Sequence, residues 1–177
     1  KGTEYVGPWT FNCLRSLIGG LTLLVLMPFL DRVRKTKADK EQKNSLLTAG
    51  IACGIVLAAG SMFQQLGIMQ TTTGKAGFIT ALYVILVPIL AIFLGRKTRL
   101  IVWLAACIAL AGFYFLSFAG ESWILQEGDL YLLICAVLFA VHILVIDHFS
   151  FVDGVRMSCL QFFVAGVICM VGMFLFE

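Results

Sequence analysis

The chain has too few charged residues for an ordinary soluble domain. Asp, Glu, Lys and Arg make up 13% of its 177 residues, and 60% are hydrophobic. A soluble domain has about 25% charged and about 45–50% apolar residues. A folded domain of this size still exposes about 30% of the surface of its unfolded chain, and so few charges cannot cover that surface. The composition therefore indicates that lipid surrounds part of the chain.

Charge is also absent from long continuous stretches. A helix needs about 20 apolar residues to cross about 30 Å of hydrocarbon, and backbone amides in lipid must pair within a helix or a closed barrel. The strict two-residue alternation of barrel strands is missing. We therefore predict an all-α, polytopic membrane helix bundle. Its six transmembrane helices are expected at about 11–30, 46–69, 76–95, 100–119, 130–147 and 157–176.

The sequence lacks the residue sets of common catalytic, metal and nucleotide sites. Gly74 and Lys75 meet in TTTGKAG, but a phosphate-binding loop needs a glycine where Met69 stands and a hydroxyl where Ala76 stands. The six cysteines lie in apolar runs without a C-x-x-C pair or a Cys/His cluster, so we interpret them as packing residues. No nucleophile and base converge at one depth. We expect no enzyme activity, no metal and no cofactor.

The positions of lysine and arginine predict the orientation of the chain. Segment 31–45 holds six basic residues and 96–99 holds three, whereas 70–75 has one and 120–129 has none. Cytoplasmic loops carry an excess of Lys and Arg. We therefore expect a multi-pass protein of the cytoplasmic membrane with loops 31–45 and 96–99 on the cytoplasmic side. Because the basic residues cluster beside membrane spans, we expect lipid contacts and no nucleic-acid partner.

Short features predict how the spans begin, bend and pack. In QTTTGK, Gly74 is expected to end one helix and Lys75 to reach the lipid headgroups. Pro88 lies in the middle of a span and is expected to kink it, because proline has no backbone donor. Gly50 and Gly54 form a G-x-x-x-G pattern, which lets two helix backbones approach closely.

The first and last spans resemble each other. Segment 12–31 aligned on 158–177, an offset of 146, gives five identities: Cys13/Cys159, Leu14/Leu160, Gly20/Gly166, Val25/Val171 and Met27/Met173. Two leucine-rich helices can also match through composition alone, so a repeat of five helices is a hypothesis. An odd number of spans would invert the second copy, as in secondary transporters. On this hypothesis an equivalent helix is missing upstream of Lys1.

Three stretches carry a resemblance to a known family: FNCLRSLIGG, GSMFQQLGIMQTTTGKAGFITALYVILVPILAIFLGRK and GDLYLLICAVLFAVHILV. Together they resemble the EamA-type branch of the drug/metabolite transporter superfamily. The resemblance implies a fragment of a ten-helix transporter with two inverted repeats, in which 1–120 supplies helices 2–5 and 128–177 supplies helices 6–7. One departure is that Arg96 and Lys97 follow Gly95, where the family often has an acidic residue.

Polar side chains inside the spans are the candidate substrate-binding residues, because polar groups in hydrocarbon usually face a bundle interior or a cavity. On the expected helix directions, five of them lie within roughly 6–11 Å of the outer boundary, and His142 and Gln161 form an inner layer. The five are Arg15, Gln64, Gln65, Thr80 and Tyr83. Gln64 and Gln65 point about 100° apart, so at most one should face a substrate.

These residues also have structural interpretations. Arg15 is shallow enough to reach the headgroups, Tyr83 can serve packing, and His142 can hydrogen-bond a neighbouring helix. The leading hypothesis is a secondary transporter, a permease or exporter of small metabolites, that works by alternating access. Arg15 would suit a carboxylate-bearing solute such as an amino acid. The alternatives are a non-transporting membrane scaffold and an intramembrane enzyme.

Overall fold

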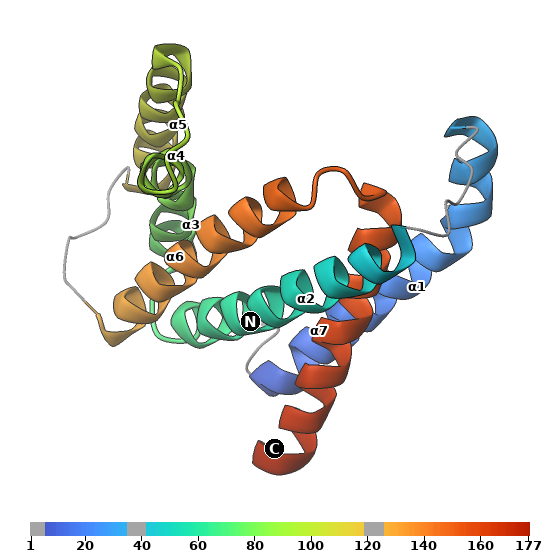
Figure 1. Ribbon diagram of the computed structural model, residues 1–177. Helices are drawn as coiled ribbons and strands as arrows, with labels where there is room; N and C mark the ends of the chain where they lie inside the picture. The colour runs from blue at the N-terminus through green and yellow to red at the C-terminus, as the bar shows by residue number, and fades with distance from the viewer. Residues whose placement is uncertain (1–5, 35–41, 119–125) are drawn as a thin grey trace. The chain divides into compact units, whose positions relative to one another are not determined.

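The computed structural model describes residues 6–34, 42–118 and 126–177, and most of them are helical (Figure 1). Within those ranges it contains no strand, which confirms the all-α prediction. The helices in chain order are α1 (Pro8–Arg34), α2 (Gln42–Ile68), α3 (Thr73–Ala81), α4 (Tyr83–Phe93), α5 (Leu100–Phe118), α6 (Glu127–His148) and α7 (Gly154–Phe176).

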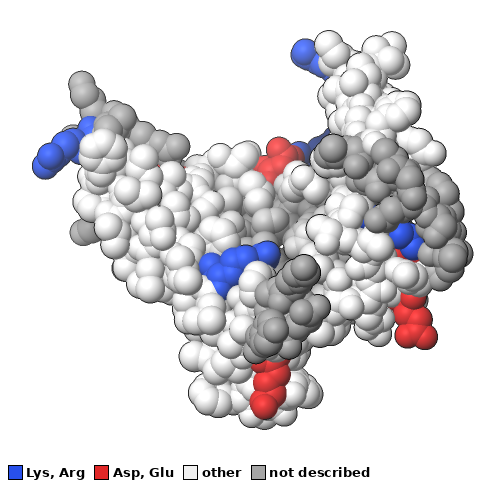
Figure 2. Space-filling view, turned by 180° about the vertical axis from the view of Figure 1, so that it is seen from behind, with Lys and Arg blue, Asp and Glu red and all other residues white. Residues whose placement is uncertain are grey.

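The helices match the six predicted spans. By length and composition, α1, α2, α6, α7 and the combined Thr73–Phe93 segment can cross a membrane, and Leu100–Phe115 is a shorter apolar helix. Figure 2 shows charged side chains in only a few places on the face it presents. The helix ends differ from the prediction by at most four residues, and most helices begin a few residues earlier than predicted because residues before the apolar runs are already helical. The structure confirms a polytopic membrane helix bundle.

The third apolar span is interrupted at Leu82. The N–H of Leu82 donates to the carbonyl of Ile79 (3.2 Å), and the N–H of Ile85 donates to the carbonyl of Leu82 (3.0 Å). Such i to i+3 bonds form a tighter turn than an α-helix. Pro88 lies inside α4, and its missing donor affects the carbonyl of Val84. The observed interruption lies upstream of Pro88, in the turn that precedes Val84, and the kink expected at Pro88 itself stays a prediction.

The end of α4 depends on a glycine. Gly95 has a positive φ of 75°. Its N–H donates to the carbonyl of Ile92 (2.8 Å), and the N–H of Arg96 donates to the carbonyl of Ala91 (2.9 Å). This pair of bonds is the Schellman motif, which places a left-handed residue directly after the helix. Glycine adopts that conformation without steric strain.

We expect Gly95→Ala to lower the stability of the folded protein by about 1–2 kcal/mol, because a Cβ is strained at positive φ. Gly112→Ala is the matched control. An added Cβ at Gly112 in α5 meets nothing within 4 Å, and alanine stabilises a helix interior by roughly 0.5–1 kcal/mol over glycine. The two variants should therefore shift the unfolding midpoint in detergent in opposite directions. A Gly95→Ala protein as stable as the wild type would contradict this assignment.

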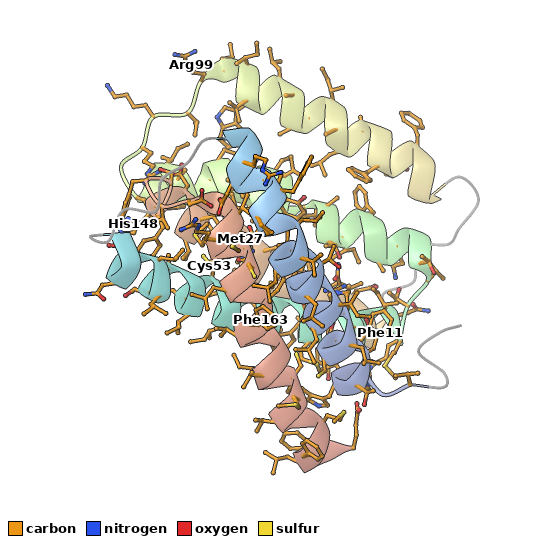
Figure 3. The ribbon with its side chains drawn as sticks, turned by 90° about the vertical axis from the view of Figure 1, so that its right-hand side faces the viewer. Phe11, Met27, Cys53, Arg99, His148 and Phe163 are labelled. Atoms are coloured by element: carbon orange, nitrogen blue, oxygen red, sulfur yellow. The ribbon has the colours of Figure 1, made fainter. Side chains whose placement is uncertain are left out.

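The chain forms two compact units, and each is described on its own. The first comprises 1–58 and 145–177, and the second comprises 59–144. In the first unit α1 packs against α7. Ala49, Cys53 and Ala58 of α2 belong to the core of the same unit. Two clusters fill it: one of Cys13, Ala58, Ala165 and Cys169, and one of Ala49, Cys53, Val152 and Met157. Cys53 of the second cluster is labelled in Figure 3.

Small residues let α2 approach α7 closely. A Cβ added at Gly54 would lie 2.6 Å from the Cβ of Val164 and 2.9 Å from the backbone oxygen of Gln161, and one at Gly50 would overlap Leu160. The close approach predicted from G-x-x-x-G is therefore present. Five of the cysteines are buried, as expected of packing residues, but Cys107 is exposed.

The second unit contains the end of α2, then α3, α4 and α5, and most of α6. Its core cluster consists of Ala76, Ile79 and Leu132, with Ile68, Phe78 and Leu82 packed around it. The α5 helix packs against α3 and α4. Aromatic rings join α6 to the other helices, since Phe139 lies edge-on to Tyr83 at 6.3 Å and Tyr131 lies 6.2 Å from Phe63. This unit holds the candidate site.

Candidate functional site

A cavity of about 290 Å³ lies among the helices of the second unit. Most of its wall is apolar. The polar groups that reach it are one carboxamide, two threonine hydroxyls and one phenol, which come from α2, α3 and α4. Its lining residues are Gln64, Ile68, Thr73, Ala76, Gly77, Thr80, Ala81, Tyr83, Val84 and Phe113.

Helical spacing explains which side chains reach the cavity. Thr73, Ala76, Gly77 and Thr80 follow one another at three- and four-residue intervals, so they share one face of α3. The small side chains on that face leave open space between the two hydroxyls. Gln64 belongs to α2 in the same unit and lines the same cavity. The cavity is thus a weakly polar pocket bounded by packed helices.

Tyr83 both packs against a neighbouring helix and lines the cavity. Its ring lies edge-on to Phe139 of α6, with an interplanar angle of 88°, and the residue also lines the cavity. Tyr83 comes directly after the 3₁₀ turn at Leu82. A change in that turn would therefore move a cavity-lining side chain.

The structure brings three of the seven predicted site residues together. Gln64, Thr80 and Tyr83 line the cavity, whereas the neighbouring Gln65 is only 4% exposed and does not line it. His142 is half-buried in the same unit and is also outside the lining. In the first unit, Arg15 is exposed and Gln161 is buried. Solute binding by any of the seven remains a prediction.

A buried ion pair joins the first turn of α3 to the start of α6. The Lys75 ammonium donates to Oδ2 of Asp129 at 2.5 Å, and the two side chains are 6% and 5% exposed. The Thr71 hydroxyl donates to Oδ1 (3.1 Å), and the backbone N–H of Gln126 donates to Oδ2 (3.0 Å). The expectation that Lys75 reaches the headgroups is wrong, because a carboxylate of α6 lies within its reach.

The expectation that Gly74 ends a helix is also wrong. Thr72 has an extended backbone and is the N-cap of α3, and its hydroxyl accepts from the N–H of Lys75 (3.4 Å). Threonine is a favoured N-cap, and it starts the helix before the glycine. Gly74 therefore lies in the first turn of α3 instead of ending α2. This N-cap aims Lys75 at Asp129 while Thr73 and Ala76 face the cavity.

The sequence contained signals for three residues that were not among the predicted site residues: Lys75, Asp129 and Thr73. Lys75 is the one basic residue of its loop and Asp129 directly precedes an apolar run, and both were expected at the outer side. Opposite charges at the same membrane depth are candidates for a pair. Thr73 is seven residues before Thr80, a spacing that shares a helix face. Phe113 had no comparable signal, because it is one of many large apolar residues of its span.

Known proteins resemble this chain in sequence. It is 32% identical over 154 residues to a protein of Archaeoglobus fulgidus named "Uncharacterized transporter", and the aligned part covers 83% of this chain and 42% of that protein. The chain thus spans less than half the length of that relative. No solved structure matches the chain. The profile of the EamA-like transporter family matches residues 1–118, and the chain belongs to this family.

Proposed function

We propose that the chain is part of a secondary transporter that carries a small metabolite across the cell membrane by alternating access. The observation that carries the proposal is the cavity among the apolar spans, to which Gln64, Thr80 and Tyr83 contribute polar groups. Small-molecule sites are concave, mostly apolar and supplied with a few polar groups that orient the ligand. At about 290 Å³, the cavity is at the lower end of the about 300–1,000 Å³ usual for such sites.

The lining indicates the chemistry of the solute. None of the described residues that line the cavity is Lys, Arg, Asp or Glu, and a full charge without a partner is costly in such surroundings. A carboxamide, hydroxyls and a phenol suit a polar group that carries an apolar portion. We therefore propose a small amphipathic solute. Arg15 belongs to the first unit and does not line this cavity, so the suggestion that it binds a carboxylate stays a separate prediction.

Thr80→Val tests the assignment, because valine keeps the shape of threonine and removes the hydroxyl. We expect the KM for uptake by the full-length protein in proteoliposomes to rise about 2- to 10-fold, the effect of one hydrogen bond worth about 0.5–1.5 kcal/mol. Thr22→Val is the matched control, since the Thr22 hydroxyl is exposed and donates to its own helix at the carbonyl of Ile18 (2.8 Å). Uptake would be measured with labelled amino acids and other small amphipathic metabolites.

The result also separates the competing functions. A scaffold would give no solute uptake above that of empty vesicles. An unchanged KM in both Thr80→Val and Tyr83→Phe, with uptake intact, would remove the cavity from the transport path. Tyr114→Phe is the control for the second variant, because Tyr114 is 41% exposed and its ring packs edge-on to Phe78.

A further inference from the structure

Two kinds of glycine occur in the helices of the second unit. A Cβ added at Gly60 would lie 2.8 Å from a phenylalanine ring of α6, and one added at Gly67 or Gly128 would lie 2.9 or 2.7 Å from the backbone oxygen of the other. Such glycines let helices approach closely. A Cβ added at Gly77 or Gly112 meets nothing within 4 Å. Helix packing within this unit therefore does not explain the last two.

Gly77 differs from Gly112 because it lines the cavity. It belongs to α3, whereas Gly112 belongs to α5 and is not among the described residues of the lining. Glycine destabilises a helix interior relative to alanine. Neither a close contact nor a positive φ requires glycine at position 77. The feature that distinguishes this position is the open space of the cavity.

Gly77 lies at the centre of the cavity-lining face of α3. Thr73 precedes it by four residues, and Thr80 and Ala81 follow it by three and four residues, so the four positions share one side of the helix. A side chain at position 77 would stand between the two threonine hydroxyls. The glycine therefore leaves room beside both of them.

The Thr80 hydroxyl indicates what this room receives. Thr80 is 9% exposed and lines the cavity, and its side chain makes no hydrogen bond to another residue that the structure describes. A buried hydroxyl without a partner is costly. A solute with a polar group at Thr80 would supply the partner. Positions 77 and 80 are neighbours on the helix surface, about 5–6 Å apart, so the rest of that solute would lie beside Gly77.

Three other helices supply the large apolar side chains of the cavity. Ile68 comes from α2, Val84 from α4 and Phe113 from α5. Together with the small residues of α3 they limit the space to about 290 Å³. This volume is at the lower end of the range for small-molecule sites. Each carbon atom added to the wall therefore takes a substantial share of the room left for the apolar portion of a solute.

We propose that Gly77 is the specificity-determining residue of the cavity and sets the largest apolar portion that a transported solute can carry. The inference rests on the proposed function, because it assigns the cavity to the solute. The Thr80 hydroxyl holds the polar end, and the apolar end lies against Gly77 and the large apolar side chains. A side chain at position 77 competes with the apolar end for space. Its effect is a change in which solutes are carried, and not an equal loss for all of them.

Gly77→Val tests the size limit, with Gly112→Val as the matched control. Uptake of labelled L-alanine, L-leucine and L-phenylalanine would be measured with the full-length protein in proteoliposomes. We expect kcat/KM for the largest amino acid that the wild type carries to fall about 10-fold or more, as for one methylene group too many in an apolar pocket. The value for the smallest should change less than about two-fold, and Gly112→Val should keep the wild-type order of preference. An equal fall for all carried amino acids, or an unchanged order in Gly77→Val, would overturn the proposal.

Thiol labelling tests the position of Gly77 without transport. Gly77→Cys in a Cys107→Ser background would be treated with methyl methanethiosulfonate in native membranes, and the modified fraction would be measured by mass after purification. The parent Cys107→Ser protein is the blank, because the other five cysteines are buried. We expect Gly77→Cys to react. Failure to react would show that position 77 does not open into the cavity, and would overturn the proposal.

A filled cavity should protect the thiol. We expect Val84→Trp, which enlarges another part of the lining, to slow the reaction of Gly77→Cys several-fold and to leave that of Gly112→Cys unchanged. Phe113→Trp is the second filling variant, for use if Val84→Trp lowers the yield of folded protein. A reaction at position 77 that neither filling variant slows would overturn the proposal. If the wild type takes up none of the three amino acids, amino-acid transport fails as the proposed function, whereas the labelling rates still decide whether Gly77 forms the open wall of the cavity.

Discussion

Asp129→Ala lowers the free energy of unfolding by about 3–5 kcal/mol, because it leaves the Lys75 ammonium buried without its carboxylate partner. Lys75 and Asp129 are 6% and 5% exposed, so little solvent is available to replace the lost interaction. The same substitution removes the acceptor of the Thr71 hydroxyl and of the Gln126 N–H. The measurement is the unfolding midpoint of purified protein in detergent, together with the yield of folded protein.

Two further variants show whether the ion pair itself is responsible. Glu127→Ala removes an exposed carboxylate from the same first turn of α6, and we expect it to change stability by less than about 1 kcal/mol. Lys75→Met combined with Asp129→Leu should recover most of the loss, because a buried ion pair is often replaced by apolar residues without penalty. Equal losses in Glu127→Ala and Asp129→Ala would show that the pair is unimportant.

The membrane spans were predictable because lipid imposes a simple requirement on sequence. Runs such as 157–176 are long, apolar and free of charge, and in hydrocarbon they can only form helices. The turn at Leu82 was not predictable in the same way. Proline marks a missing donor at its own position, but where the backbone tightens depends on the neighbouring helices. Local sequence therefore predicted the existence of the elements better than their interruptions.

The candidate site was also predictable only in part. Gln64, Thr80 and Tyr83 were found by depth, since a polar side chain inside a span needs a partner or a cavity. The Lys75–Asp129 pair was missed because 54 residues separate its members, and the sequence does not show which ends of the helices meet. The headgroup interpretation was reasonable for an isolated lysine. It failed because tertiary packing brought an acid to it.

Gly67→Val and Gly128→Val should be as damaging as the loss of Asp129. A Cβ added at Gly67 would lie 2.9 Å from the backbone oxygen of Gly128, and one added at Gly128 would lie 2.7 Å from the backbone oxygen of Gly67. A backbone oxygen cannot change rotamer as a side chain can, so α2 and α6 would have to separate to make room for the added atoms. Overpacking costs about 1–3 kcal/mol even where side chains can adjust. We expect the yield of folded protein to fall sharply, with Gly112→Val as the control, because an added Cβ at Gly112 meets nothing within 4 Å.

The close contact of α2 and α6 at Gly67 and Gly128 also determines how the effects of the glycine and Asp129 substitutions combine. Gly128 is adjacent to Asp129, so a separation of the helices at Gly67 also pulls the Asp129 carboxylate away from Lys75. Substitutions that act on one contact are not additive, whereas distant ones usually are. We therefore expect Gly128→Ala together with Asp129→Ala to cost less than the sum of the two single effects, in a double-mutant cycle on unfolding midpoints. Additive losses would mean that the glycine crossing and the ion pair stabilise the second unit independently.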